Sequence, residues 1–299
     1  MWNIRGKEKK FMFFKKKKEK EELYDWRDQW TPKHITAFMV LCLFTVIFIF
    51  PFYWIITGAF KDQGAAIAMP PQWFPEEPTM QNWLSLSKQP LARWTFNSFF
   101  IAISTTFLVC LTSALAGYVL AKKRFPGRKF AFWLLIVAMA LPKQVIMVPL
   151  FNILTTLDWI DTYKSLILPA VGWPFGIFLM KQFSETIPTE LIEAAKIDGC
   201  SELSIFKNIV IPIVKPGIAA LGIFTFISSW NDYFMQLILI RSKTMQTLPL
   251  GIATMQLEFA TDYGLMMAGA ALASIPMIII FLMFQKSFTQ GITIGAVKG

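Results

Sequence analysis

The chain contains six apolar stretches that are each long enough to cross a lipid bilayer, and this feature limits its fold more than any other. A helix needs about 20 apolar residues to span the hydrocarbon core. The six stretches run over Ile35–Phe60, Phe96–Ala121, Phe130–Leu154, Ser165–Phe183, Ile213–Ile240 and Leu265–Phe284. A hydrophobic content of 55% and a mean hydropathy of +0.50 exclude a pair of soluble domains. The sequence therefore predicts an all-α membrane protein with six transmembrane helices.

Charge is distributed unevenly between the connections, which predicts the orientation in the membrane. Residues 1–33 carry eleven Lys and Arg against six Asp and Glu, and residues 122–129 carry five basic residues and no acid. The loop over residues 61–93 has three of each sign. Because short basic loops stay on the cytoplasmic side, we expect the N-terminus and the second connection to be cytoplasmic. Six spans would return the C-terminus to the same side.

The same features predict three regions of the chain. Residues 1–33 form a basic cytoplasmic segment, 34–287 a six-span domain, and 288–299 a cytoplasmic tail. The lysine run at residues 15–18 suits a juxtamembrane segment attracted to anionic lipid, and we favour this interpretation over a nucleic-acid-binding arm. No nucleic acid is therefore expected as a partner.

Small residues and prolines interrupt the apolar stretches. Small and hydroxyl residues such as Ser113 and Gly117 recur in the second stretch, and they allow membrane helices to approach closely. The third and fourth stretches are broken by prolines, which free a carbonyl group and bend the helix. These positions are Pro142, Pro149, Pro169 and Pro174.

Two polar groups fall within apolar surroundings. Lys143 would lie near the middle of the membrane if the third helix were straight, or near the outer surface if the helix ended at the flanking prolines. Asn231 and Asp232 follow Trp230 near the outer end of the fifth stretch. They could line a water-filled pathway or support helix packing, and the sequence leaves both open.

A charged, helix-forming segment over residues 187–212 separates the fourth and fifth stretches. Pro188 suits the first turn of a helix. Gly199 can adopt the left-handed conformation that ends one. Ser201 is a suitable cap for a second helix, which we expect to end before Pro212. The segment is thus predicted to form a helix–turn–helix that protrudes on the cytoplasmic face.

This protruding segment could be an inert linker, a helix lying on the lipid surface, or a lever held by another protein. A lipid-surface helix favours a basic polar face. Here four acidic residues outnumber two lysines, so we favour the lever. The acidic residues are Glu190, Glu193, Asp198 and Glu202.

The segment also resembles a known motif. Its residues are Glu193-Ala194-Ala195, Gly199, Ile209 and Ile211-Pro212. They match the EAA loop of ABC-importer permeases, which reads Glu-Ala-Ala, three residues, Gly, nine residues, Ile, one residue and Leu-Pro. Only the Leu differs, because Ile211 takes its place.

Other segments resemble one branch of that family, the MalG-like permeases of the maltose and glycerol-3-phosphate group. The similar segments are Ser229-Trp230-Asn231-Asp232, Leu248-Pro249-Leu250-Gly251 and the ending Gly291-Ile292-Thr293-Ile294-Gly295-Ala296-Val297-Lys298-Gly299. The resemblance covers residues 35–299. It implies a MetI-like permease fold in a prokaryotic inner membrane and the import of di- or oligosaccharides by alternating access.

The resemblance also implies partners and site residues. The partners are a second, MalF-like permease, two ABC ATPase subunits and an extracytoplasmic sugar-binding protein. Glu193, Ala194, Ala195, Asp198 and Gly199 would contact the ATPase, and the tail residues Gly291, Gly295, Lys298 and Gly299 would reach the ATPase dimer interface. Gly251, Met255 and Glu258 would meet the binding protein. Asn231 and Asp232 are the candidates for the pathway.

An enzyme is the least favoured class. The chain has no Gly-x4-Gly-Lys-Ser/Thr phosphate loop and a single histidine, His34. We therefore expect no catalytic residue, metal or cofactor on this chain, with ATP and Mg bound by the ATPase. The alternative function is an ion-coupled secondary transporter. Such a transporter usually needs a carboxylate near the membrane midplane, and the one candidate, Asp232, is poorly placed for this near the outer end of its stretch.

Overall fold

The computed structural model describes residues 31–258 and 262–296, and none of these residues belongs to a β-strand. The chain divides into two units, Met1–Ile55 and Ile56–Gly299. The first unit contains most of helix α2 (Pro32–Gly58), which is apolar along its length and includes Pro51. The charged stretch before residue 31 lies outside the described residues.

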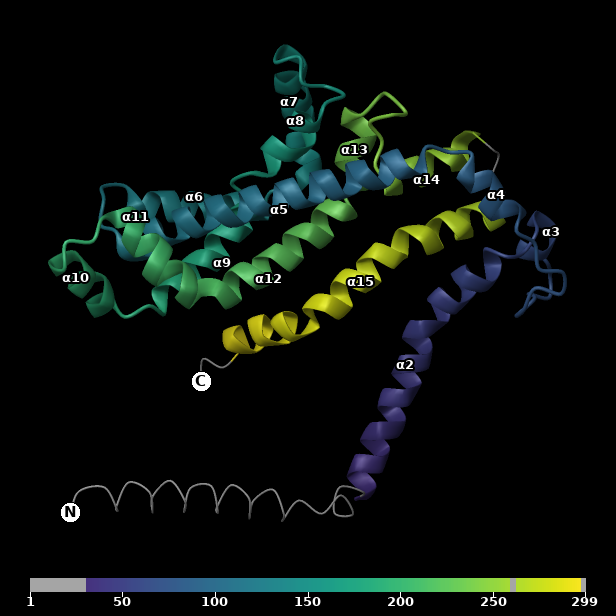
Figure 1. Ribbon diagram of the computed structural model, residues 1–299, viewed down its shortest axis with the longest axis horizontal. Coiled ribbons are helices and arrows are strands. Elements are labelled where there is room, and N and C mark those ends of the chain that lie inside the picture. Colours follow the sequence, from purple (N-terminus) through teal and green to yellow (C-terminus); the bar gives the residue numbers. More distant parts are fainter. Residues whose placement is uncertain (1–30, 259–261, 297–299) are drawn as a thin grey trace. The chain divides into compact units, whose positions relative to one another are not determined.

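The second unit contains the remaining helices (Figure 1). In chain order these are α3 (Gln63–Ala66), α4 (Gln81–Ser87), α5 (Leu91–Lys122), α6 (Arg128–Ala140), α7 (Lys143–Thr156), α8 (Tyr163–Ile167), the 3-10 turn η1 (Leu168–Ala170), α9 (Pro174–Glu185), α10 (Thr189–Ile197), α11 (Glu202–Ile205), the π-helical η2 (Phe206–Val210), α12 (Ile211–Trp230), α13 (Tyr233–Leu239), α14 (Leu248–Glu258) and α15 (Tyr263–Ala296).

Helix α5 is the centre of this unit, because it packs along both α9 and α12, and α12 in turn packs on α15. Figure 1 shows these helices side by side. Helices α5 and α9 approach each other closely at Gly117, where a Cβ atom would lie 2.6 Å from the backbone of Met180 and Lys181. The expected role of small residues in the second apolar stretch is therefore confirmed at this position.

Two hydrophobic clusters hold opposite ends of the bundle. One joins α5, α9 and α12 to the protruding α10 and α11, through buried residues that include Tyr118, Ile192 and Phe206. The other surrounds Trp94 and Trp230 and brings α14 and α15 against α5 and α12. The protruding segment therefore shares a continuous core with the membrane helices.

The third and fourth apolar stretches are bent helix pairs. Helix α6 ends at Ala140, and Pro142 is the N-cap residue of α7. The chain direction bends by 103° between the two helices. The pair formed by residues 163–170 and α9 bends by 40°. Breaks were expected in both stretches. Pro149, by contrast, lies inside α7 without ending it.

The fifth apolar stretch differs from the prediction of one helix over Ile213–Ile240. Helix α12 ends at Trp230, and α13 begins at Tyr233. The interruption has a local cause, because the Asp232 side chain accepts a hydrogen bond from the backbone N–H of Met235 and caps α13. An aspartate at this position favours starting a new helix over continuing the old one.

Four helices of the described residues are long and apolar enough to cross a membrane. Each of the two bent pairs meets the same criterion as one unit, which gives up to six spans. The expected number of six is thus reached when each bent pair counts as a single crossing. The last helix, α15, continues to Ala296, so it passes through the predicted boundary at residue 287 without a break.

Candidate functional site

Helix α10 projects from the end of α9 and presents two different faces. Ile192 and Ala195 are buried in the hydrophobic cluster that reaches α5. Glu193, Ala194 and Asp198 are exposed on the other side. Of the residues predicted to contact a partner, Ala195 therefore packs inward and contributes to the seating of α10, whereas the others form its free surface.

The free surface also contains two large apolar side chains. Ile197 is 87% exposed and Leu191 is 46% exposed. Large apolar side chains that are exposed together on one surface mark a candidate contact with another protein. The motif comparison of the sequence did not identify Leu191 or Ile197. The sequence feature that could have identified them is the break in amphipathic periodicity, since both are apolar on a face of the helix that is otherwise polar.

The turn after α10 is a Schellman motif. Gly199 has a φ of +78°. Its N–H donates to the Lys196 carbonyl at 3.0 Å, and the Cys200 N–H donates to the Ala195 carbonyl at 2.9 Å. These two bonds satisfy carbonyls that the helix end would otherwise leave unpaired. The prediction that Gly199 ends the helix in the left-handed region is confirmed.

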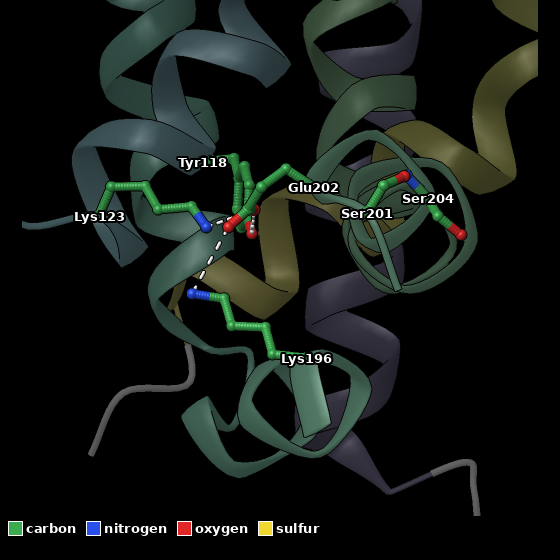
Figure 2. A network of polar contacts seen from close by, with 6 residues as sticks. All are labelled: Tyr118, Lys123, Lys196, Ser201, Glu202 and Ser204. Carbon is green, nitrogen blue, oxygen red and sulfur yellow. Dashed lines mark hydrogen bonds and ion pairs between the residues drawn. The ribbon is translucent and has the colours of Figure 1, made fainter. Parts of the chain in front are cut away.

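Glu202, at the start of α11, joins three elements through its carboxylate (Figure 2). Oε2 pairs with Lys123 Nζ and accepts a hydrogen bond from Tyr118 Oη at 3.4 Å. Oε1 lies 3.5 Å from Lys196 Nζ on α10. The end of α5 is thus connected to both helices of the protruding segment. We name this set of Tyr118, Lys123, Lys196 and Glu202 the Glu202 network.

Neighbouring contacts reinforce the Glu202 network. Lys122 Nζ donates to the Ile187 carbonyl at 2.6 Å and to the Glu185 carbonyl at 3.3 Å, at the end of α9. Partial burial favours the neutral amine of Lys123, but its hydrogen bonds to Glu202 and Tyr118 outweigh this and raise its pKa above the ordinary value. Lys123 is therefore a permanent cation at neutral pH, and the ion pair with Glu202 is maintained.

The sequence predicted that the second helix of the protruding segment would end before Pro212, and this prediction is wrong. Residues from Glu202 to Trp230 form one continuous helix, with a π-helical stretch at Phe206–Val210. Pro212 lies at the first turn of α12. A π-helical turn accommodates the missing N–H of a proline, because the hydrogen-bond register shifts by one residue. Motion of α10 and α11 can therefore be passed directly along α12.

At the far end of α12, the structure brings together two polar groups that the sequence treated separately. Lys143 Nζ, at the first residue of α7, lies 3.6 Å from Asp232 Oδ2. The Asp232 side chain is 24% exposed and that of Lys143 is 56% exposed. Asn231 donates to the Ile227 carbonyl at 3.0 Å and so supports the end of α12. No local pattern links residues 143 and 232, and a single sequence gives no signal for the pair.

The residues predicted to meet a binding protein lie on α14, and two of them face inward. Gly251 is buried against the Trp94 ring, and Met255 is 4% exposed. The side chain of Glu258 is outside the described residues. In the predicted tail, Gly291 and Gly295 lie within α15, whereas Lys298 and Gly299 are outside the described residues.

Comparison with known families places the chain among membrane transport subunits. Residues 113–294 match the family described as the binding-protein-dependent transport system inner membrane component. The match spans α5 to α15 and includes the whole protruding segment. The chain belongs to this family. It is a multi-pass inner-membrane permease subunit with a MetI-like fold and is not itself an enzyme, which excludes the alternative of an ion-coupled secondary transporter.

Relatives with similar sequences extend over most of the chain. The arabinooligosaccharides transport system permease protein AraQ of Bacillus subtilis is 33% identical and covers 91% of this chain and 98% of its own length. AraQ of Halalkalibacterium halodurans is 37% identical over 75% of this chain and 81% of its own. The sulfoquinovosyl glycerol transport system permease protein SmoH of Agrobacterium fabrum is 32% identical, with coverage of 88% and 93%.

The fold is also similar to that of a solved transporter. A crystal structure of a bacterial ABC transporter involved in import of the acidic polysaccharide alginate contains a chain that matches with a TM-score of 0.75. It is 21% identical, and the match covers 89% of this chain and 99% of that one. This similarity supports the permease fold.

Proposed function

We propose that this chain forms half of the translocation pathway of an ATP-driven importer for di- or oligosaccharides. The curated relatives are named for arabinooligosaccharides and sulfoquinovosyl glycerol, which share glycosidic chemistry. The observation that carries the proposal is the exposed face of α10, which is connected to the continuous α11–α12 helix through the Lys196–Glu202 pair and yet has no cover within the described chain. Such a surface is suited to receive force from a separate protein.

In the proposed mechanism, two ABC ATPase subunits bind ATP and Mg and close on each other, and one of them holds α10. Glu193, Ala194, Asp198 and Gly199 supply the contact, and Leu191 and Ile197 supply apolar area. Because α10 and α5 are tied by the Glu202 network, movement of the ATPase reorients the helices. The pathway then alternates between inward-facing and outward-facing states.

The remaining partners follow from the same assignment. A second, MalF-like permease would complete the pathway, and an extracytoplasmic sugar-binding protein would deliver substrate near α14, with Glu258 as a contact. Both termini would be cytoplasmic, and the end of α15 with the tail to Gly299 would approach the ATPase dimer. Asn231 and Asp232 would then lie toward the outer end of the pathway.

Affinity purification of the tagged chain from mild-detergent membranes tests the assembly. We expect an ABC ATPase and a second permease to copurify, as identified by mass spectrometry. The binding protein of the same system can then be screened for thermal stabilisation by mono-, di- and oligosaccharides. Recovery of the chain without any ATPase would contradict the proposed coupling. Stabilisation by non-carbohydrate solutes alone would contradict the proposed substrate class.

The Glu202 network gives a prediction about coupling. Glu202→Lys places a third cation beside Lys123 and Lys196, so α10 should lose its fixed orientation relative to α5. Exposed ion pairs each contribute about 0.2–1 kcal/mol to the stability of the contact they form. Because the variant loses two pairs and gains a repulsion, α10 should transmit less of the ATPase movement, and uptake should fall roughly five-fold. Combining the change with Lys123→Glu recreates an ion pair and should restore most of the uptake.

The matched control is Glu77→Lys, which makes the same charge change on an exposed loop between α3 and α4. Uptake in cells is measured together with membrane abundance and the ATPase activity of the purified complex. A network that only supports folding would lower abundance and uptake in parallel. Equal uptake by Glu202→Lys and the unmodified chain would show that the network does not orient α10.

The Lys143–Asp232 pair gives a second prediction. Asp232→Asn removes the charge while keeping an effective N-cap for α13. The pair connects the start of α7 to the α12–α13 junction, so its loss should alter the balance of states and lower uptake by up to about five-fold. Asp262→Asn is the matched control, since Asp262 caps α15 through the Leu265 N–H. Equal effects of both substitutions would assign Asp232 a capping role only.

A further inference from the structure

The turn between α5 and α6 carries five basic residues, and the structure divides them into two groups. Lys122 donates to the Ile187 and Glu185 carbonyls, and Lys123 pairs with Glu202. The Arg128 guanidinium donates to the Lys123 and Ala121 carbonyls, both at 3.3 Å. These three cations therefore have internal roles. They stabilise the end of α5 and the protruding segment.

The other two basic residues, Arg124 and Lys129, are exposed and form no ion pair with any residue that the structure describes. Both line a shallow, open surface cavity of about 520 Å³. Its other lining residues are Phe125, Gly127, Arg128 and Phe130. The site thus combines uncompensated positive charge with aromatic walls, and it contains no acidic side chain.

An apolar stripe on α6 begins at this cavity. Phe130, Trp133, Leu134 and Val137 follow the i, i+3, i+4, i+7 spacing of one helix face, and each is at least 58% exposed. The opposite side of α6 packs on α9, where the Phe132 and Phe178 rings stack with centroids 6.3 Å apart. The stripe therefore faces away from the bundle.

The position along the helix axis places the cavity in the headgroup region. Helix α5 has 32 residues, which corresponds to about 48 Å at 1.5 Å per residue. The hydrocarbon core is about 30 Å thick, so α5 is longer than the core. Because charged side chains are costly inside it, the basic residues that follow Ala121 place the C-terminal end of α5 and the following turn outside the core. Trp133 lies one helical turn into α6, and tryptophan is enriched at the boundary between headgroups and acyl chains.

We propose that this turn binds an anionic phospholipid. Arg124 and Lys129 would bind the headgroup phosphate, and the acyl chains would lie along the stripe from Phe130 to Val137. Basic pockets beside transmembrane helices recognise anionic headgroups in this way. A phospholipid fits both parts of the surface, since a soluble phosphate would use the cavity alone and an apolar partner would use the stripe alone.

Native mass spectrometry of the purified full-length chain in mild detergent tests the proposal. The chain is titrated with phosphatidylglycerol or phosphatidylcholine, and bound lipid is counted. We expect Arg124→Gln with Lys129→Gln to weaken phosphatidylglycerol binding by about 30-fold, because each juxtamembrane basic residue contributes a factor of about five. Lys88→Gln with Lys164→Gln removes the same charge from exposed positions elsewhere and should leave binding unchanged.

A second variant and a competitor separate the lipid from other ligands. Phe130→Ser with Trp133→Ser should weaken lipid binding while both cations remain. Soluble glycerol phosphate should compete only at far higher concentration than the lipid. Equal competition would indicate an anion site and overturn the proposal, as would unchanged phosphatidylglycerol binding by the Arg124 and Lys129 double variant. Loss of the bound lipid when the second permease is added would assign the stripe to a protein interface and would equally overturn it.

Discussion

Gly199→Asp is expected to reduce uptake by at least ten-fold while the protein remains in the membrane at its normal abundance. Gly199 has a φ of +78°, and a Cβ atom there would meet no atom within 4 Å. Aspartate is one of the few residues other than glycine that adopts the left-handed region, so the turn should persist. The new carboxylate, however, would stand in the surface proposed to contact the ATPase.

The size of this effect follows from the cost of covering an unpaired charge. A charged group buried without a partner in an interface costs about 2–5 kcal/mol, and each 1.4 kcal/mol corresponds to a factor of ten in affinity. Asp198 is adjacent, and like charges add to the penalty. We therefore expect loss of ATPase copurification from mild-detergent membranes together with the loss of uptake.

Two controls separate charge, shape and position. Gly199→Asn has nearly the same shape without the charge, and it should retain much of the uptake. Gly127→Asp introduces the same residue at another glycine with a positive φ, +82°, and with open space around it. Gly127 precedes α6 and is outside both the protruding segment and the apolar stretches, so its substitution should leave ATPase binding intact. Normal uptake by Gly199→Asp at normal abundance would refute the role assigned to α10.

Local signals allowed the sequence to predict the protruding segment well. Helix α10 is terminated by Gly199 because glycine adopts the left-handed backbone conformation freely. The cap of α11 is equally local, since the Ser201 hydroxyl accepts a hydrogen bond from the Ser204 N–H three residues later. Both features are decided by neighbours in the chain. The break at Pro142 was predicted for the same reason.

Features that depend on distant residues could not be predicted from the sequence. The Lys143–Asp232 pair joins residues 89 positions apart, and the Glu202–Lys123 contact joins residues 79 apart. Neither has a signal in residue type or spacing. The inward position of Ala195 and Met255 was also missed, because a family motif identifies residues without stating which face of a helix they occupy. Continuous α11–α12 geometry through Pro212 required the π-helical stretch, which has no reliable sequence signature.

Gly117→Ala is expected to destabilise the whole helix bundle, although it adds a single methyl group. The new Cβ atom would lie 2.6 Å from the Lys181 nitrogen and the Met180 carbonyl carbon. Real Cβ atoms do not approach backbone atoms this closely, so α5 and α9 would have to separate along their contact. Overpacking of this type costs about 1–3 kcal/mol. Here the cost should reach the upper end of that range, because the obstructing atoms are backbone and cannot rotate away.

The matched control is Gly222→Ala on α12, where the added Cβ atom would lie 3.7 Å from Cys110 Sγ and from Thr106 Cγ2. This is ordinary van der Waals contact, so we expect no measurable loss. The apparent melting temperature of each variant in detergent, followed by size-exclusion chromatography with fluorescence detection, checks both outcomes. If Gly117→Ala melted at the same temperature as Gly222→Ala, the α5–α9 contact would not be the tight packing on which the seating of α10 depends. Since the Glu202 network and the adjacent core attach α10 to α5, loosening this contact should also lower the ratio of uptake to ATP hydrolysis.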